Sequence, residues 1–233
     1  MPRTIFLLSL ACCAALLAAC SPLPKFARPQ VIEDPDYLSK EDVIYYRSLT
    51  RADFKGMQPP RGFDQRMAAA ICAYIEPQEV EGRKLKIEYL GSIQGRHKYA
   101  VTHREMTFLA RVDRDCSWWN PDNAANPLPE PCILQHEQVH FALFELAARD
   151  MSREFRATTF QISGTDSTSL KEDMERQVRQ FFQQRMDKLV RENFDFDEQT
   201  SARFDPVRQK EWLVTAADKL GDRSIVERWQ CEP

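Results

Sequence analysis

Alternation of apolar and polar residues dominates the first half of the folded chain and predicts β-strands. Residues 85–89, 98–102 and 106–112 each place apolar side chains at every second position, with Lys, Glu, Thr or Arg at most positions between them and Ala100 and Leu109 at the others. A period of two is typical of strands that bury one face. Residues 43–46 predict a further strand, and the apolar residues 68–75 fit either a strand or a short helix. Together these segments indicate an antiparallel sheet.

The second half of the chain repeats its apolar positions at helical spacing. From Cys132 onward a stripe recurs every three or four residues and predicts a first helix. Residues 169–193 predict a second helix whose apolar stripe packs in the core, and Pro206 suits the first turn of a third helix. We expect residues 113–131 to form a loop with the Trp118-Trp119 pair in the core, and lining of a cleft is the alternative for this pair. The expected fold class is α+β, with an N-terminal antiparallel sheet packed on the first helix and two further C-terminal helices.

The first 20 residues have the pattern of an export signal. Arg3 precedes an apolar run, residues 5–19, that is too short for a comfortable membrane span and ends in small residues. The sequence from Leu17 to Cys20 resembles the bacterial lipobox, in which the cysteine becomes the lipidated first residue of the mature protein. An ordinary signal peptide followed by an incidental cysteine is the alternative.

This resemblance implies a division of the chain and a location. We expect a signal peptide at 1–19, a proline-rich tether at 20–41 and one domain at 42–233. By resemblance to sorting in Gram-negative bacteria, Ser21 after the cysteine indicates a lipid anchor in the outer membrane, with the domain facing the periplasm. An acyl anchor attaches a protein to a membrane without spanning it.

Charge and size exclude some classes of function. Removing the 19-residue signal from 233 residues leaves 214, enough for one sizeable core or two small ones, and the loss of Arg3 changes the net charge from −3 to −4. No basic tract or aromatic-basic face suggests nucleic acid as a partner. The mature chain also contains no other apolar stretch long enough to span a bilayer.

Four cysteines remain in the mature chain after lipidation of Cys20, namely Cys72, Cys116, Cys132 and Cys231. An even number in an oxidising compartment indicates disulfides, and three pairings are open. We favour Cys116–Cys132 together with Cys72–Cys231. The first would close a loop of about 15 residues, a stabilisation of about 3 kcal/mol in the chain-entropy model. Metal binding by these cysteines is less favoured because no CxxC pair occurs.

The strongest chemical signal is an HExxH motif, His136 to His140, within the first predicted helix. Residues four apart lie on one helix face, so both imidazoles can bind one metal ion. Glu137 lies about 100° further round the helix, beside the metal, where it can take a proton from a metal-activated water. The motif therefore predicts Zn²⁺ bound by His136 and His140, with Glu137 as general base. Two histidines on an ordinary helix are the alternative.

The residues around this motif resemble a known family. The run from His136 to Arg149 is similar to the HEQxHFxxxELxAR helix of the bacterial domain of unknown function 922. Residues 49–56, LTRADFKG, are similar to the LTWxDFKG of that family, and Ser117-Trp118 stands where the family has a Ser-Trp pair. The resemblance extends from about Tyr45 to Leu220. It implies a secreted zinc-dependent protease with a zincin-like fold.

The C-terminal part of the resemblance departs from the family pattern at some positions. Residues 196–212 are similar to a YDxETxH block followed by QxxW, with Asp197, Thr200, Gln209 and Trp212 keeping the pattern. Phe196 replaces the tyrosine of this block, and Ala202 replaces its histidine. These departures favour an alternative function, a non-catalytic envelope lipoprotein whose degenerate zincin domain serves for binding or assembly.

A hydrolytic zinc site needs three protein ligands and one open position, and the motif names only two ligands. Glutamates on a later helix serve as the third ligand in thermolysin-like enzymes, so we rank the candidates Glu175, Asp197 and Glu172, in that order. Glu145 lies about 140° round the helix from His140 and is expected to support the site or form a surface ion pair. His97 and His103 lie on or near predicted strands and are weaker candidates.

These observations predict metal-assisted peptide hydrolysis in the cell envelope. A peptide or protein is the expected substrate, and the membrane is contacted through the N-terminal lipid. A purely structural zinc site is disfavoured, because HExxH supplies only half of a closed tetrahedral ligand set.

Overall fold

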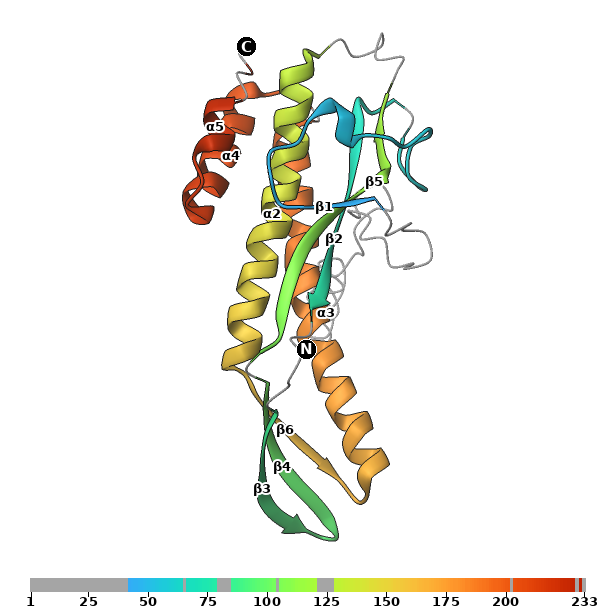
Figure 1. Ribbon diagram of the computed structural model, residues 1–233, viewed down its shortest axis with the longest axis vertical. Helices are drawn as coiled ribbons and strands as arrows, with labels where there is room; N and C mark the ends of the chain where they lie inside the picture. Colours follow the sequence, from blue (N-terminus) through green and yellow to red (C-terminus); the bar gives the residue numbers. More distant parts are fainter. Residues whose placement is uncertain are drawn as a thin grey trace, which may run out of the picture.

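The computed structural model describes residues 42–64, 66–78, 85–103, 105–120, 128–201, 203–228 and 231. The predicted signal peptide, Cys20 and the proline-rich tether fall in residues 1–41, outside the described residues. Ala202 lies outside them as well. Within this part of the chain the fold is α+β, as the hydrophobic pattern predicts (Figure 1).

Two three-stranded antiparallel sheets lie one beyond the other along the molecule (Figure 1). The first has the order β1-β5-β2, with β1 at Val43–Tyr45, β5 at Thr107–Trp119 and β2 at Ala69–Gln78. The second has the order β3-β4-β6, with β3 at Leu85–Ile93, β4 at Arg96–His103 and β6 at Thr159–Gly164. The strand positions are confirmed, and residues 68–75 lie in a strand for most of their length. The single N-terminal sheet expected from the sequence is wrong, because the strands form two sheets and β6 follows α2 in the chain.

Four α-helices complete the part of the fold that is described. They are α2 at Glu130–Ala157, α3 at Ser167–Thr200, α4 at Pro206–Leu220 and α5 at Ser224–Arg228. The side chain of Asp166 caps α3 by accepting a hydrogen bond from the Ser169 amide. Pro206 opens α4 as predicted, while α3 continues past the predicted end at residue 193.

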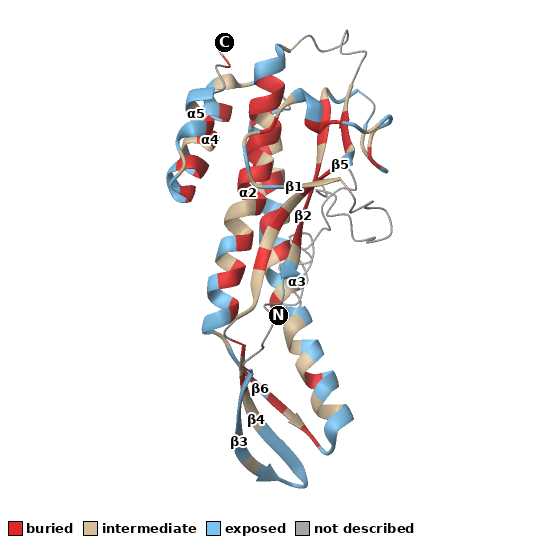
Figure 2. Cartoon of the chain, in the orientation of Figure 1, coloured by how far each residue is buried: buried red, intermediate tan, exposed pale blue. Residues whose placement is uncertain are grey.

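The first sheet packs on α2, and α3 and α4 pack on the same helix from other sides (Figure 1). Buried residues line this interface along the upper part of α2 (Figure 2). Phe155 near the end of α2 joins the two halves of the molecule, because its ring contacts Phe108 of β5, Phe160 of β6 and Phe181 of α3. One continuous core therefore holds α2 and α3 at a fixed distance.

The predicted loop at 113–131 is wrong in its first part, because β5 continues to Trp119. Around Asp113 and Cys116 the register of β5 against β2 shifts, and the Asp113 carboxylate accepts the amides of Asp115 and Cys116. This irregularity breaks the simple alternation that marks a strand in sequence. Trp118 is buried and Trp119 packs on Phe54, so the prediction of a core tryptophan pair is confirmed.

All four predicted cysteines form disulfides, but the predicted pairing is wrong. The bonds are Cys72–Cys116 and Cys132–Cys231. Antiparallel pairing of β2 with β5 brings the Cα atoms of Cys72 and Cys116 to 5.7 Å, although 44 residues separate them. Cys132 instead meets the C-terminal segment, with a Cα–Cα distance of 4.7 Å. Proximity in sequence favoured Cys116–Cys132. Strand pairing instead brings Cys72 to Cys116, and Cys132 bonds to Cys231.

Candidate metal centre

His136 and His140 occupy one face of α2, one turn apart, as the motif predicts. Their imidazole centroids lie 4.8 Å apart, and their Nε2 atoms lie 3.2 Å apart. Both side chains are largely buried, with exposed fractions of 16% and 13%. Two nitrogens that face each other this closely need a proton or another cation between them, because two lone pairs repel.

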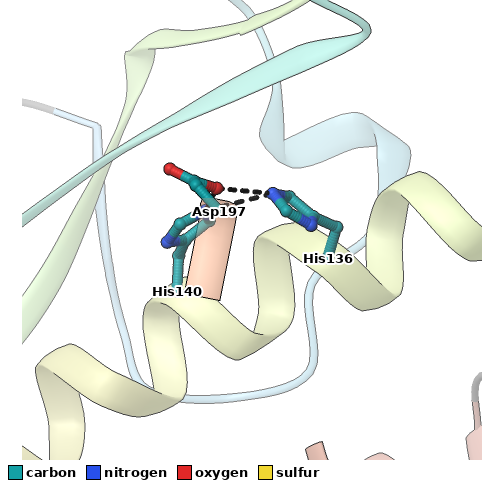
Figure 3. A group of neighbouring side chains, drawn as sticks. All are labelled: His136, His140 and Asp197. Carbon is teal, nitrogen blue, oxygen red and sulfur yellow. Dashed lines mark hydrogen bonds and ion pairs between the residues drawn. The ribbon is translucent and has the colours of Figure 1, made fainter. Parts of the chain in front are cut away.

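Asp197, near the C-terminal end of α3, completes the group (Figure 3). Its Oδ1 atom lies 3.1 Å from Nε2 of His136 and 3.0 Å from Nε2 of His140. Ligand atoms bound tetrahedrally to zinc at about 2.0–2.1 Å lie roughly 3.3 Å apart. The three donor atoms are therefore spaced and directed as a bound divalent cation requires.

The predicted ranking of the third ligand is wrong, because Asp197 and not Glu175 reaches the histidines. Glu172 and Glu175 are exposed near the start of α3, and Glu175 pairs with Lys171 at 3.7 Å. The 22 positions from Glu175 to Asp197 amount to about 33 Å of helix. Only the far end of α3 passes the HExxH motif, and the sequence pattern does not reveal where two helices meet.

Two amide side chains orient the imidazoles through hydrogen bonds to their Nδ1 atoms. Nδ1 of His140 lies 2.7 Å from Oδ1 of Asn193, and Nδ1 of His136 lies 3.3 Å from Oε1 of Gln209. The Nδ2 group of Asn193 donates to the Leu189 carbonyl, and the Nε2 group of Gln209 donates to the Cys132 carbonyl. Each amide oxygen therefore faces its histidine and accepts the Nδ1 proton. This arrangement leaves both Nε2 atoms for a metal ion.

Sequence reasoning did not assign a role to these two amides. Gln209 carried a signal, because it keeps its place in the QxxW pattern of the resemblance. Asn193 carried a signal only once Asp197 is known to face the histidines. It lies four residues before Asp197 and thus on the same face of α3. Both side chains are buried. Buried amides normally have hydrogen-bond partners, as these two do.

Phe196 forms the floor of the site. Its ring is fully buried, stacks on His136 with centroids 4.5 Å apart, and meets His140 edge-on at 4.9 Å. Trp212 of α4 also packs against Phe196, with ring centroids 5.6 Å apart. A phenyl ring thus orients both imidazoles although it lacks the hydroxyl group of the tyrosine in the family pattern.

Glu137 lies beside the two histidines and is held by β2. Its Oε2 atom accepts a hydrogen bond of 3.0 Å from the Ile71 amide. Ile71 is the residue that the register shift between Ala70 and Cys72 leaves unpaired with β5, so its amide is directed at α2 instead. Burial raises the pKa of Glu137 above its ordinary value.

A cleft of about 720 Å³ opens onto this site. His136, Glu137 and Gln209 form part of its wall, together with residues of the first turn of α2, the segment before β2, and the end of α3 with the segment that follows it. Asp197 itself is 40% exposed at its side chain. The site therefore has a closed side, formed by Phe196 and the amides, and an open side that a substrate could reach.

The electrostatics of the group favour a cation. Burial alone would lower the pKa of His140, but the negative charge of Asp197 and its hydrogen bond raise this pKa to about 9. Burial likewise opposes ionisation of Asp197, yet the charge of His140 and hydrogen bonds from both histidines hold the pKa of Asp197 well below its ordinary value. Without metal, a proton on His140 thus occupies the position between the donor atoms.

The remaining candidates lie elsewhere. Glu145 forms the predicted surface ion pair, with its Oε1 atom 2.8 Å from Nε of Arg149. His97 lies on β4 beside Tyr89, and His103 packs on Phe155. Among the described residues, the group of His136, His140 and Asp197 is the one whose donor atoms all lie within 4.8 Å of one another.

Comparisons of the chain with family models, with curated proteins and with solved structures found no match. The resemblance to domain 922 and the zincin-like fold therefore stay predictions. In the part of the chain that the structure describes, no helix combines the length and the apolar character needed to cross a bilayer.

Proposed function

We propose that this protein is a zinc-dependent metallopeptidase with a zincin-like domain. The observation that carries this proposal is the meeting of Asp197 Oδ1 with the Nε2 atoms of both HExxH histidines beside Glu137. Two imidazoles and one carboxylate form a ligand set that catalytic zinc sites use, with a fourth position left for water.

Each residue has a defined role in this proposal. His136, His140 and Asp197 hold the ion, and Asn193 and Gln209 fix the imidazole tautomers. When bound, zinc supplies Lewis-acid activation of water and of the scissile carbonyl group. Glu137 accepts the proton of that water and passes it to the leaving amine. Its raised pKa supports this role, since a proton carrier works best when its pKa lies near the working pH.

The open side of the site supports catalysis over a structural zinc site. Structural zinc is enclosed by four protein ligands, whereas this group has three and adjoins the cleft. Its volume of about 720 Å³ lies in the range of ligand-binding pockets. A peptide or protein substrate also agrees with the resemblance noted from the sequence.

The location belongs to the same proposal. The lipobox-like sequence ending at Cys20 and the proline-rich residues after it support a lipid-anchored protein of the cell envelope, facing the periplasm from the outer membrane. Two disulfides among the four remaining cysteines support an oxidising compartment.

Metal analysis and hydrolysis assays on purified variants test the function. We expect about one zinc ion per chain, lost in His140→Ala and in Asp197→Asn. Glu137→Gln should retain the metal and lower the hydrolysis rate of unfolded protein or cell-wall peptide by a factor of at least about 10². Glu145→Gln is the matched control on the same helix, and it should change neither quantity.

The outcomes separate the enzyme from the alternative. Full zinc content without hydrolysis of either substrate class would favour the non-catalytic binding or assembly module. An unchanged rate in Glu137→Gln would remove the assigned general base. Absence of zinc under zinc-replete conditions would remove the metallopeptidase altogether.

A further inference from the structure

The outer strand of the second sheet exposes an unusual number of large apolar side chains. Nine-residue β3 contains Leu85, Ile87, Tyr89, Leu90 and Ile93, with exposed fractions of 43%, 60%, 55%, 48% and 57%. Figure 2 shows this strand exposed along almost its whole length, at one end of the molecule. Exposed apolar residues are ordinary when scattered, but a cluster of this kind marks a contact surface.

The exposure arises because the core covers only part of a line of apolar side chains that runs across the three strands. Ile87 of β3 pairs with Val101 of β4, which pairs with Phe160 of β6, so the three side chains lie on the same sheet face. Val101 and Phe160 are each only 4% exposed, whereas Ile87 is 60% exposed. The core therefore covers two strands of this sheet and leaves the third strand uncovered.

β3 also has a free edge, since β4 is its one strand neighbour among the described residues. Backbone amide and carbonyl groups on such an edge can pair with another strand. Strand alternation places Leu85, Ile87 and Tyr89 on the uncovered face and Lys86 and Glu88 on the opposite face. Both faces therefore carry a pattern that a partner strand can match.

We propose that β3 pairs with β3 of a second copy of this chain, antiparallel and centred on Ile87. In this register Ile87 faces Ile87 of the second copy, and Leu85 faces Tyr89. On the other sheet face, Lys86 faces Glu88 of the second copy, and the twofold axis repeats this pair. Two ion pairs and three apolar pairs form, and both sheets join into one.

Neighbouring registers are less favourable, which is why a second copy fits better than an arbitrary strand. A centre on Lys86 would place two lysines opposite each other, and a centre on Glu88 would place two glutamates opposite each other. A centre between two residues would pair the apolar face of one copy with the charged face of the other. The sequence from 85 to 89 is thus self-complementary in one register.

The pairing has a limited length. A register shift between Tyr89 and Gly91 interrupts the regular strand, and Gly91 has a φ of 120°. Short, interrupted edges are typical of contacts that must not grow into fibres. We therefore expect a weak dimer whose population depends on concentration. The metal centre lies on the upper half of α2 in Figure 1, far from β3, and stays accessible in the dimer.

Sedimentation velocity of the purified full chain over a wide concentration range tests the proposal. Wild type should shift from monomer to dimer as concentration rises. Lys86→Glu and Glu88→Lys should each raise the dimer dissociation constant about tenfold or more, because both ion pairs become like-charge pairs. The double variant with both changes should restore dimerisation, and so should an equimolar mixture of the two single variants.

Cysteine cross-linking checks the register. Ile87→Cys should give a covalent dimer under mild oxidation, since directly opposed strand residues have Cα–Cα distances suited to a disulfide. Lys86→Cys alone should cross-link far less, because residue 88 and not residue 86 faces it.

Several results would overturn the proposal. These are a wild type that stays monomeric at every concentration, a dimer indifferent to both charge reversals, or cross-linking stronger at 86 than at 87. Binding of the monomer to anionic lipid vesicles through β3, without dimerisation, would assign the surface to a membrane instead. Unchanged thermal melting of the variants excludes misfolding as the cause.

Discussion

At the residue scale, a proton and a metal ion would compete for one position in the candidate metal centre. Nε2 of His140 lies 3.0 Å from Asp197 and 3.2 Å from Nε2 of His136, so one cation can serve all three atoms. In the metal-free protein that cation is a proton, held because the Asp197 carboxylate raises the pKa of His140 to about 9. A metal ion must displace this proton, since the ligand form of histidine is neutral.

Zinc binding should therefore release protons at neutral pH. The pKa of His140 is raised, so the proton is bound below about pH 9 and lost above it. The apparent zinc affinity should rise by about tenfold per pH unit up to that value and then level off. Isothermal titration in buffers of different ionisation enthalpy measures the protons released. No difference between buffers at pH 7 would contradict this account.

A second prediction concerns the amide behind His140. Asn193→Ala removes the acceptor that lies 2.7 Å from Nδ1 and fixes the ring orientation. Loss of such a support lowers metal affinity by about 10–100-fold. Competition with a chelator of known affinity measures the change. Asn193→Asp keeps an acceptor oxygen and should retain most of the affinity, whereas exposed Asp195→Ala on the same helix should have no effect.

At the element scale, the site depends on an irregular segment, residues 49–56, that connects α2 to β5. Gln138, inside the motif, accepts the Leu49 amide at 2.7 Å and thereby binds the segment that precedes the 3-10 helix Arg51–Asp53 to α2. Further along this segment, the amide of Gly56 donates to the Ser117 carbonyl of β5 at 2.8 Å. The same stretch of β5 carries the irregularity opposite Ile71, whose amide holds Glu137.

Gly56→Ala should destabilise this arrangement by about 1–3 kcal/mol, the usual effect of overpacking. A Cβ atom at this position would lie 3.0 Å from the carbonyl oxygens of Cys116 and Ser117, and backbone atoms cannot easily move away. Urea unfolding followed by circular dichroism measures the free energy of unfolding. Met57→Ala changes the neighbouring residue, which is 95% exposed, and should be neutral. Equal stability of both variants would contradict the close packing.

At the scale of the whole molecule, α2 is the central element of the main core. The first sheet, α3 and α4 all pack on it, and the Cys132–Cys231 disulfide ties its first turn to the C-terminal segment. Cys132 lies one turn before His136, and its carbonyl accepts the Nε2 group of Gln209. Closure of the chain therefore also supports the position of Gln209 beside His136 of the candidate metal centre.

Replacing Cys132 and Cys231 together by alanine should cost on the order of 4–5 kcal/mol of stability. This is the chain-entropy value for a closed loop with a sequence separation of 99 residues. Urea unfolding of the oxidised protein and of the double variant measures the difference. Non-reducing peptide mapping provides the independent check, because a peptide that joins residues 116 and 132 would contradict the observed pairing.

Much of the site could be predicted because its information is local. Helical spacing fixes the relation of His136 to His140, and the strand alternation and helical stripes gave the α+β class with most element positions. Even so, the half-buried strand expected at residues 85–89 is wrong in its burial, since β3 is exposed. Alternation records which side chains share a face, but not whether anything covers that face.

The sequence by itself determined the two histidines, the neighbouring acid and the elements that carry them, because each depends on contacts within a few residues. Only the tertiary structure decided that Asp197 lies against both histidines, that Asn193 and Gln209 contact the Nδ1 atoms of the rings, and which cysteines pair. These partners lie between 44 and 99 residues apart in the chain. Their meeting depends on how α3 crosses α2 and how β2 pairs with β5, and packing of the whole core sets both.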